Sequence, residues 1–84
     1  MKIIAAAIKK NGVVFTGARH GYIIQSMVDV GFITDMKRDY VHAHEQGFID
    51  ENGDFWYRTE SREIAIHAGQ VPNSIGTLYS EDLW

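Results

Sequence analysis

Apolar and polar residues along the first 31 positions follow the pattern of a β-hairpin that leads into a helix. Two β-rich runs, residues 2–10 and 13–16, flank the pair Asn11-Gly12. Such a pair between extended runs favours a type I′ turn, because both central residues of that turn need positive φ. Over residues 20–30 the apolar positions recur at helical spacing, and Gly31 stands where a C′ glycine ends a helix. The sequence therefore predicts a hairpin and a first helix.

The same order of elements recurs in the second half of the chain. Glu51-Asn52-Gly53 separates two runs, residues 47–50 and 54–58, and predicts a second hairpin with the same turn chemistry. Thr59 is then the expected N-cap of a second helix over residues 60–68, which a C′ glycine and a nearby proline terminate. The order of hairpin and helix thus occurs twice.

These elements indicate an α+β fold class. Four strands in one sheet with both helices on the same side bury both apolar helix stripes with the fewest layers. We therefore expect a single domain, residues 1–84, built as a small antiparallel sheet of two hairpins with two helices packed on one face. Residues 36–41 are predicted to form a short helix or an irregular loop, and residues 70–77 a loop. The other sheet face, or an edge, is left for a partner subunit or a ligand.

The chain is short and has no cysteine, so we expect a thin core. A fold of 84 residues buries only about 60 to 65% of the surface that its unfolded chain exposes. Because neither disulfides nor a thiolate metal cluster can add stability, we expect a homodimer or a higher homo-oligomer. Residues 78–84 are rich in large apolar and aromatic side chains, and we expect this segment to dock on its own or a neighbouring subunit.

Charge and hydropathy limit the range of partners. The formal net charge of −3 argues against binding to duplex nucleic acid, which needs many lysines and arginines to neutralise phosphates. The apolar run at residues 3–8 is too short to span a bilayer, and it lacks a small-residue cleavage pattern. We therefore expect a cytosolic protein without a membrane partner. A small anionic ligand is compatible with this charge, since a pocket needs only two or three convergent arginines.

Three arginines stand near the predicted N-termini of the two helices. Arg19 and His20 lie between the first hairpin and the first helix. Arg58 occupies the equivalent junction before the second helix, and Arg62 follows one turn later. The helix dipole disfavours cations at such positions, and a phosphate-bearing ligand would offset that cost. The alternative, which the sequence leaves open, is pairing of Arg58 and Arg62 with nearby carboxylates on a solvated face, namely those of Asp54, Glu60 or Glu63.

Aromatic residues are concentrated in the second predicted hairpin. Strand alternation sends Phe55 and Tyr57 to one side of the sheet and Trp56 to the other, and Phe48 precedes them in the same hairpin. An aromatic ring beside a guanidinium is the combination that holds a nucleobase together with its phosphate. Aromatics in a hairpin are more often core or dimer-interface residues. Stacking on a base is therefore one of two interpretations.

Residues that could support metal binding or catalysis form no recognised motif. The nearest approach is a set of imidazoles and a carboxylate suited to zinc, namely His20, His42, His44 and Glu45. No strand pattern surrounds the last three, so a short solvent-exposed loop is the simpler interpretation. The serines stand in no nucleophile motif, and the sequence has no glycine-rich phosphate loop. We therefore expect no metal, no cofactor and no enzymatic activity.

Five stretches, read in order, resemble the phage anti-Thoeris family, the first Thoeris anti-defence group of small sponge proteins. They extend over nearly the whole chain and are residues 5–12 (AAAIKKNG), 16–21 (TGARHG), 45–50 (EQGFID), parts of 58–70, and 78–84 (LYSEDLW). Their most specific parts are Arg19-His20 and residues 79–84.

The resemblance implies a non-enzymatic role, which is capture of the cyclic ADP-ribose isomer made by a bacterial TIR-domain protein, so that the downstream effector is never activated. It implies dimers or higher oligomers that hold ligand at subunit interfaces, in the cytoplasm of the infected bacterial host. Some members also hold cyclic oligonucleotides at separate sites, and the short stretch before residues 78–84 leaves open whether this chain has such a site.

The candidate ligand-binding residues combine the matching motif positions with the chemistry of their side chains. Tyr57 stands where the family's pattern suggests a small polar residue, and it is included for its ring. The set is Arg19, His20, Phe48, Tyr57, Arg58 and Arg62.

Two other functions are alternatives to capture of a nucleotide signal. The first is a phage inhibitor that binds a host protein directly, and the second is a metal-dependent phosphodiesterase. A sponge would release intact ligand on denaturation, whereas an enzyme would release product. An inhibitor would bind a protein and ignore nucleotides.

Overall fold

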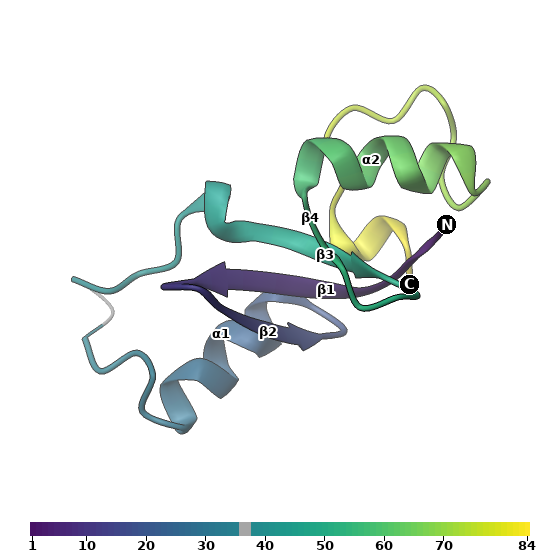
Figure 1. The fold of residues 1–84 in the computed structure, drawn as a ribbon. Helices are drawn as coiled ribbons and strands as arrows, with labels where there is room; N and C mark the ends of the chain where they lie inside the picture. The colour runs from purple at the N-terminus through teal and green to yellow at the C-terminus, as the bar shows by residue number, and fades with distance from the viewer. Residues whose placement is uncertain (36–37) are drawn as a thin grey trace.

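The computed structural model describes residues 1–35 and 38–84, which form a four-stranded sheet and two α-helices (Figure 1). In chain order the elements are β1 Ile3–Lys10, β2 Val13–Gly17, α1 His20–Asp29, the 3-10 helix η1 Ala43–Glu45, β3 Gln46–Asp50, β4 Phe55–Tyr57, α2 Arg58–His67 and the 3-10 helix η2 Ser80–Asp82. This order confirms the α+β class and the two successive units of hairpin and helix. In the described ranges no helix is long and apolar enough to cross a membrane.

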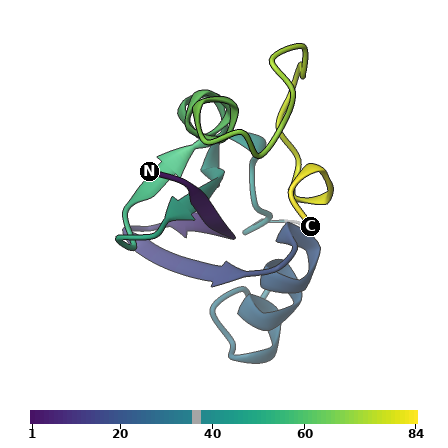
Figure 2. The same ribbon diagram turned by 90° about the vertical axis from the view of Figure 1, so that its right-hand side faces the viewer.

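The two hairpins join into one antiparallel sheet. The strand order is β2-β1-β3-β4, so the two hairpins meet where β1 pairs with β3. Ala7 of β1 lies opposite Gly47 of β3, which in turn lies opposite Tyr57 of β4. Both helices pack on one face of the sheet, as predicted, because residues of α1 and α2 share one buried cluster with Ala6 and Ile8 of β1. Figure 2 shows the two helices at opposite ends of the curved sheet. The last residue of β4, which directly precedes α2, is therefore held by its pairing with Gly47 of β3.

The core lies between the helices and the sheet face that carries Ala6, Ile8 and Phe48. These three residues have no exposed surface, and alternation places Ala6 and Ile8 on the same face of β1. The buried hydrophobic cluster comprises Ile3, Ala6, Ile8, Ile23, Met27, Ile33, Phe48, Ala65, Val71 and Leu78. Its members come from both helices, from β1 and β3, and from the loops around them, so the core is one continuous layer.

Residues 78–84 pack on their own chain in this structure. The indole Nε1 of Trp84 donates a hydrogen bond to the carbonyl oxygen of Ala18 at 2.6 Å. Nη1 of Arg19 donates to the carbonyl oxygen of Ser80 at 3.0 Å. The segment thus links the loop before α1 to the region around α2.

The two Asn-Gly turns have different conformations. Asn11 and Gly12 both have positive φ, at 53° and 78°, as the predicted type I′ turn requires. In the second hairpin only Gly53 has positive φ, so the prediction of the same turn chemistry is wrong. The reason is Asp50, whose Oδ1 accepts hydrogen bonds from the amides of Asn52 and Asp54 and thereby holds the loop in a wider turn.

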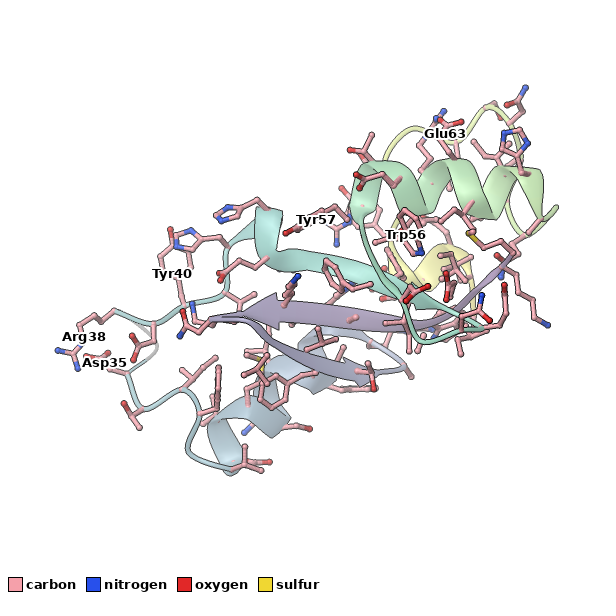
Figure 3. The ribbon with its side chains drawn as sticks, viewed as in Figure 1. Asp35, Arg38, Tyr40, Trp56, Tyr57 and Glu63 are labelled. Carbon is pink, nitrogen blue, oxygen red and sulfur yellow. The ribbon has the colours of Figure 1, made fainter. Side chains whose placement is uncertain are left out.

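Asp50 also anchors β4 through its second carboxylate oxygen. Oδ2 accepts a hydrogen bond from the indole Nε1 of Trp56 at 2.8 Å, and Asp50 has no exposed surface. This indole bond, followed by the amide bonds, lowers the pKa of the Asp50 carboxyl. Trp56 therefore lies on the helix side of the sheet, beneath α2 (Figure 3). The opposite orientation of Phe55 and Tyr57, whose rings touch each other at 5.1 Å, confirms the predicted alternation.

The ends of the helices are close to those predicted, with one exception. Gly31 and Gly69, at φ of 79° and 73°, follow α1 and α2 as the expected C′ glycines. The N-cap of α2 is Tyr57 and not Thr59, so the helix begins two residues earlier than predicted. Tyr57 has no side-chain cap hydrogen bond. The amide groups of the first turn of α2 therefore have no acceptor from their own N-cap.

The segment between the two units is a loop on both sides of residues 36–37. The prediction for residues 36–41 depends in part on Met36 and Lys37, which lie outside the described residues. Beyond them, the amide of Asp39 donates to the carbonyl oxygen of Asp35 at 2.7 Å in a turn. The chain then enters η1, which leads directly into β3.

Candidate functional site

The N-terminus of α2 adjoins two cavities that share Arg58 and Thr59. The larger cavity has a volume of about 520 Å³ and is lined by Ala43, His44, Gln46, Tyr57, Arg58 and Thr59. The smaller cavity has a volume of about 220 Å³ and is lined by Arg58, Thr59, Arg62, Gly76, Thr77 and Leu78. Three of the six candidate residues, Tyr57, Arg58 and Arg62, therefore meet at one helix end.

Arg58 is held from two sides, but one of its donors has no partner. Its Nη2 donates to Oε1 of Gln46 at 3.2 Å, and the ring of Tyr79 lies 5.3 Å from the guanidinium carbon. Its Nε is buried and donates to no acceptor within residues 1–35 and 38–84. A buried guanidinium nitrogen without an acceptor costs free energy. An anion bound to this guanidinium would supply such an acceptor.

Arg62 is partly committed to its own surroundings. Its Nε donates to the carbonyl oxygen of Ile75 at 2.9 Å, and its Nη1 pairs with Glu63 at 2.6 Å. The alternative of ion pairs on a solvated face therefore describes Arg62. It does not describe Arg58, which takes part in none of the ion pairs of the described residues.

Arg19 and His20 lie away from the two cavities and connect elements of the fold. Arg19 donates to the carbonyl oxygen of Ser80. His20 is 8% exposed, its Nε2 lies 2.8 Å from the carbonyl oxygen of Gly47, and its ring packs edge-on against Phe48. Since Phe48 has no exposed surface, neither ring faces a ligand in this conformation. We interpret these residues as supports for the site.

Burial is the largest influence on His20 and lowers its pKa below the ordinary 6.5. The bond to Gly47 raises this pKa, Arg58 lowers it, and Glu81 raises it, with a net lowering. The folded protein therefore binds a proton at His20 less readily than the unfolded chain does. The stability that depends on neutral His20 is fully present above about pH 6.5 and is lost as the pH falls through the lowered folded-state value.

We expect the midpoint of thermal unfolding to fall between pH 7 and pH 5 in the wild type, and to fall less in His20→Gln. The glutamine amide can donate to the Gly47 carbonyl but does not titrate, so the difference between the two profiles isolates His20. Circular dichroism melts at half-unit pH intervals measure it. Parallel profiles for the two proteins would contradict the assignment of a buried neutral imidazole.

The larger cavity combines flat side chains with polar groups. Tyr57 is 48% exposed at its wall, at the junction of β4 and α2 (Figure 3). The ring of His44 stacks on that of His42 with centroids 5.1 Å apart. Gln46, whose side chain accepts the hydrogen bond from Arg58, lines the same cavity. Such a wall suits a planar, partly polar group.

The histidines of this loop are arranged differently from a metal site. Both carboxylate oxygens of Glu45 approach Lys10, at 3.4 and 3.5 Å, and Oε1 also accepts from the amide of His42. The described part of the chain contains no group of three or more potential metal ligands. The Glu45 carboxylate therefore links η1 to β1 through Lys10.

Gln46, Thr77 and Tyr79 belong to the site, although no sequence argument selected them. Gln46 carries no charge that would attract notice, and only its hydrogen bond to Arg58 gives it a role. Tyr79 lies in the apolar segment whose docking place the sequence does not specify. Its contact with Arg58 depends on where residues 78–84 pack on the folded chain. Local sequence patterns do not predict that position.

The fold and these cavities define a small α+β protein in which two cavities lined by arginine adjoin the N-terminus of α2. The model of the phage T4 y16D protein family matches residues 2–84. Because this match covers nearly the whole chain, the protein belongs to that phage family. No curated protein and no solved structure gives a significant match.

Proposed function

We propose that this phage-family protein captures a cyclic ADP-ribose-type signal of bacterial Thoeris defence and sequesters it without degrading it. The observation that carries the proposal is Arg58, which lines both cavities and whose buried Nε has no acceptor among the described residues. A phosphate oxygen is the acceptor that a guanidinium binds most strongly. The sequence resemblance to anti-Thoeris sponges and the membership of a phage family agree with this role.

Capture needs affinity and not turnover. Affinity would come from charge-assisted hydrogen bonds to Arg58 and Arg62, from the amides at the start of α2, and from stacking on Tyr57. The protein would act in the cytoplasm of the infected host, in proportion to its amount. We further propose that it acts as a homodimer or higher homo-oligomer, because the second face of the sheet carries apolar side chains such as Val14, 42% exposed.

The test is stoichiometric. Native mass spectrometry of the purified protein, with and without a panel of cyclic ADP-ribose isomers and cyclic oligonucleotides, should give an adduct of fixed stoichiometry with one of them. Heating the complex should return that ligand chemically intact. Release of a hydrolysed product, with more than one molecule converted per protein, would replace capture by catalysis. No adduct across the panel would overturn the proposal.

A direct inhibitor of a host protein is the second candidate. It is favoured by the exposed apolar residues along β1 and β2, namely Ile4, Val13 and Val14, each more than 40% exposed. β2 is an edge strand of the sheet, and such edges can pair with another chain. A charged substitution, Val14→Lys, should abolish a protein interaction of this kind and leave the binding of nucleotides unchanged.

A further inference from the structure

The smaller cavity has the lining of a phosphate site. Two guanidinium groups, from Arg58 and Arg62, and two hydroxyl-bearing residues, Thr59 and Thr77, border about 220 Å³. It opens at the start of α2, where backbone amides are free to bind an anion. The lining contains no carboxylate, so nothing among these six residues would repel one.

The larger cavity has a different chemistry. Its volume of about 520 Å³ is bordered by the rings of Tyr57 and His44 and by the amide side chain of Gln46. Arg58 is the one arginine or lysine in its lining. Flat aromatic surfaces beside an amide suit a planar heterocycle with its sugar, and they offer little to a second phosphate.

Arg58 lines both cavities. A single ligand that occupies both would therefore pass this residue. Its Nη2 is engaged with Gln46 on the side of the larger cavity, and its Nε has no acceptor within the described residues. The packing of Tyr79 over the guanidinium keeps it in this position. The junction between an anionic group and a ring system should therefore lie at Arg58.

We infer that the smaller cavity binds a diphosphate and the larger cavity binds the nucleoside attached to it, so that a nucleoside 5′-diphosphate is the minimal ligand. This inference rests on the proposed function and specifies how the captured nucleotide lies in the site. A cyclic ADP-ribose-type molecule contains this unit. The two halves of the ligand should then respond to different substitutions.

Isothermal titration calorimetry with ADP and with inorganic pyrophosphate separates the two halves. For the wild type we expect ADP to bind about tenfold more tightly than pyrophosphate, because one stacked base contributes a factor of this order. Arg62→Gln should weaken both ligands by about tenfold and leave their ratio unchanged. Tyr57→Ala should weaken ADP alone and bring the ratio close to one.

Matched controls are available elsewhere on the surface. Tyr22, 71% exposed on α1, and Arg38, exposed in the loop before η1 (Figure 3), line neither cavity. Tyr22→Ala and Arg38→Gln should leave both affinities within twofold of the wild type. Circular dichroism melts of all four variants identify any that fail to fold.

The outcomes distinguish this inference from the proposed function. If Tyr57→Ala and Arg62→Gln weaken ADP and pyrophosphate by the same factor, the division of the two cavities is wrong although capture stands. The same holds if a cyclic ADP-ribose isomer binds tightly while ADP and pyrophosphate do not bind. If none of these nucleotides binds the wild type, the proposed function itself is wrong.

Discussion

Gly47→Ala is expected to destabilise this protein strongly. A Cβ at this position would overlap the carbonyl oxygen of Trp56 on β4 and lie 2.8 Å from Cζ of Phe55. The obstructing oxygen is backbone, so β4 must shift away from β3. Overpacking of this kind costs about 3 kcal/mol, which is a large part of the roughly 5 to 15 kcal/mol that stabilises a small domain.

We expect the thermal midpoint of Gly47→Ala to fall by more than about 10 °C, since 1 kcal/mol moves the midpoint of a domain of this size by about 4 to 8 °C. Differential scanning calorimetry measures the change. Gly21→Ala in α1 is the matched control, because a Cβ there meets no atom within 4 Å. Alanine within a helix is better than glycine by up to about 1 kcal/mol, so this control should not lose stability. Equal midpoints for the two variants would refute the close approach of β3 and β4.

Gly47 also shows why this substitution should affect the site. Its carbonyl oxygen contacts Nε2 of His20, and its neighbour Gln46 holds Arg58. A displaced β4 would move Tyr57, which is both the N-cap of α2 and a wall of the larger cavity. The close approach of β3 and β4 at Gly47 thus positions the residues of the candidate ligand site.

Local patterns predicted the elements because each depends on residues close together in the chain. The type I′ turn at Asn11-Gly12 follows from the backbone preferences of two residues. The second turn differs because one buried carboxylate, that of Asp50, takes the amides of the loop and the indole of Trp56 together. The predicted cap at Thr59 failed for a similar reason, since the end of β4 already delivers Tyr57 to the start of α2.

The sequence predicted which charged residues belong to the candidate site, but it did not predict which other side chains they contact. Arg58 and Arg62 stand out because cations are unfavourable at a helix N-terminus, and both line the smaller cavity. The same rule selected Arg19, whose guanidinium instead binds the carbonyl oxygen of Ser80, 61 residues away in sequence. A hydrogen bond at that separation depends on the completed fold, as does the contact of Tyr79 with Arg58.

Arg58→Met should separate ligand binding from stability. Arg58 would make about two charge-assisted hydrogen bonds to a phosphate, and the loss of one such bond costs about 1.5 to 3 kcal/mol. We therefore expect the affinity for the captured nucleotide to fall at least about tenfold. In the free protein, methionine removes the hydrogen bond to Gln46 and the contact with Tyr79, but it also removes a buried donor without an acceptor. These opposed contributions, each on the order of 1 kcal/mol, should leave the thermal midpoint nearly unchanged.

Two further variants make this expectation specific to Arg58. Arg62→Met should lower affinity and stability together, because it breaks the bonds to Ile75 and Glu63, while Arg38→Met should change neither. Calorimetric titration and thermal melts on the same preparations give both quantities. A large loss of stability in Arg58→Met with unchanged affinity would make Arg58 a structural residue of the α2 junction. A loss of affinity at constant stability would mean that this guanidinium contributes nothing net to the stability of the free fold, which is the expected property of a group whose partner is the ligand.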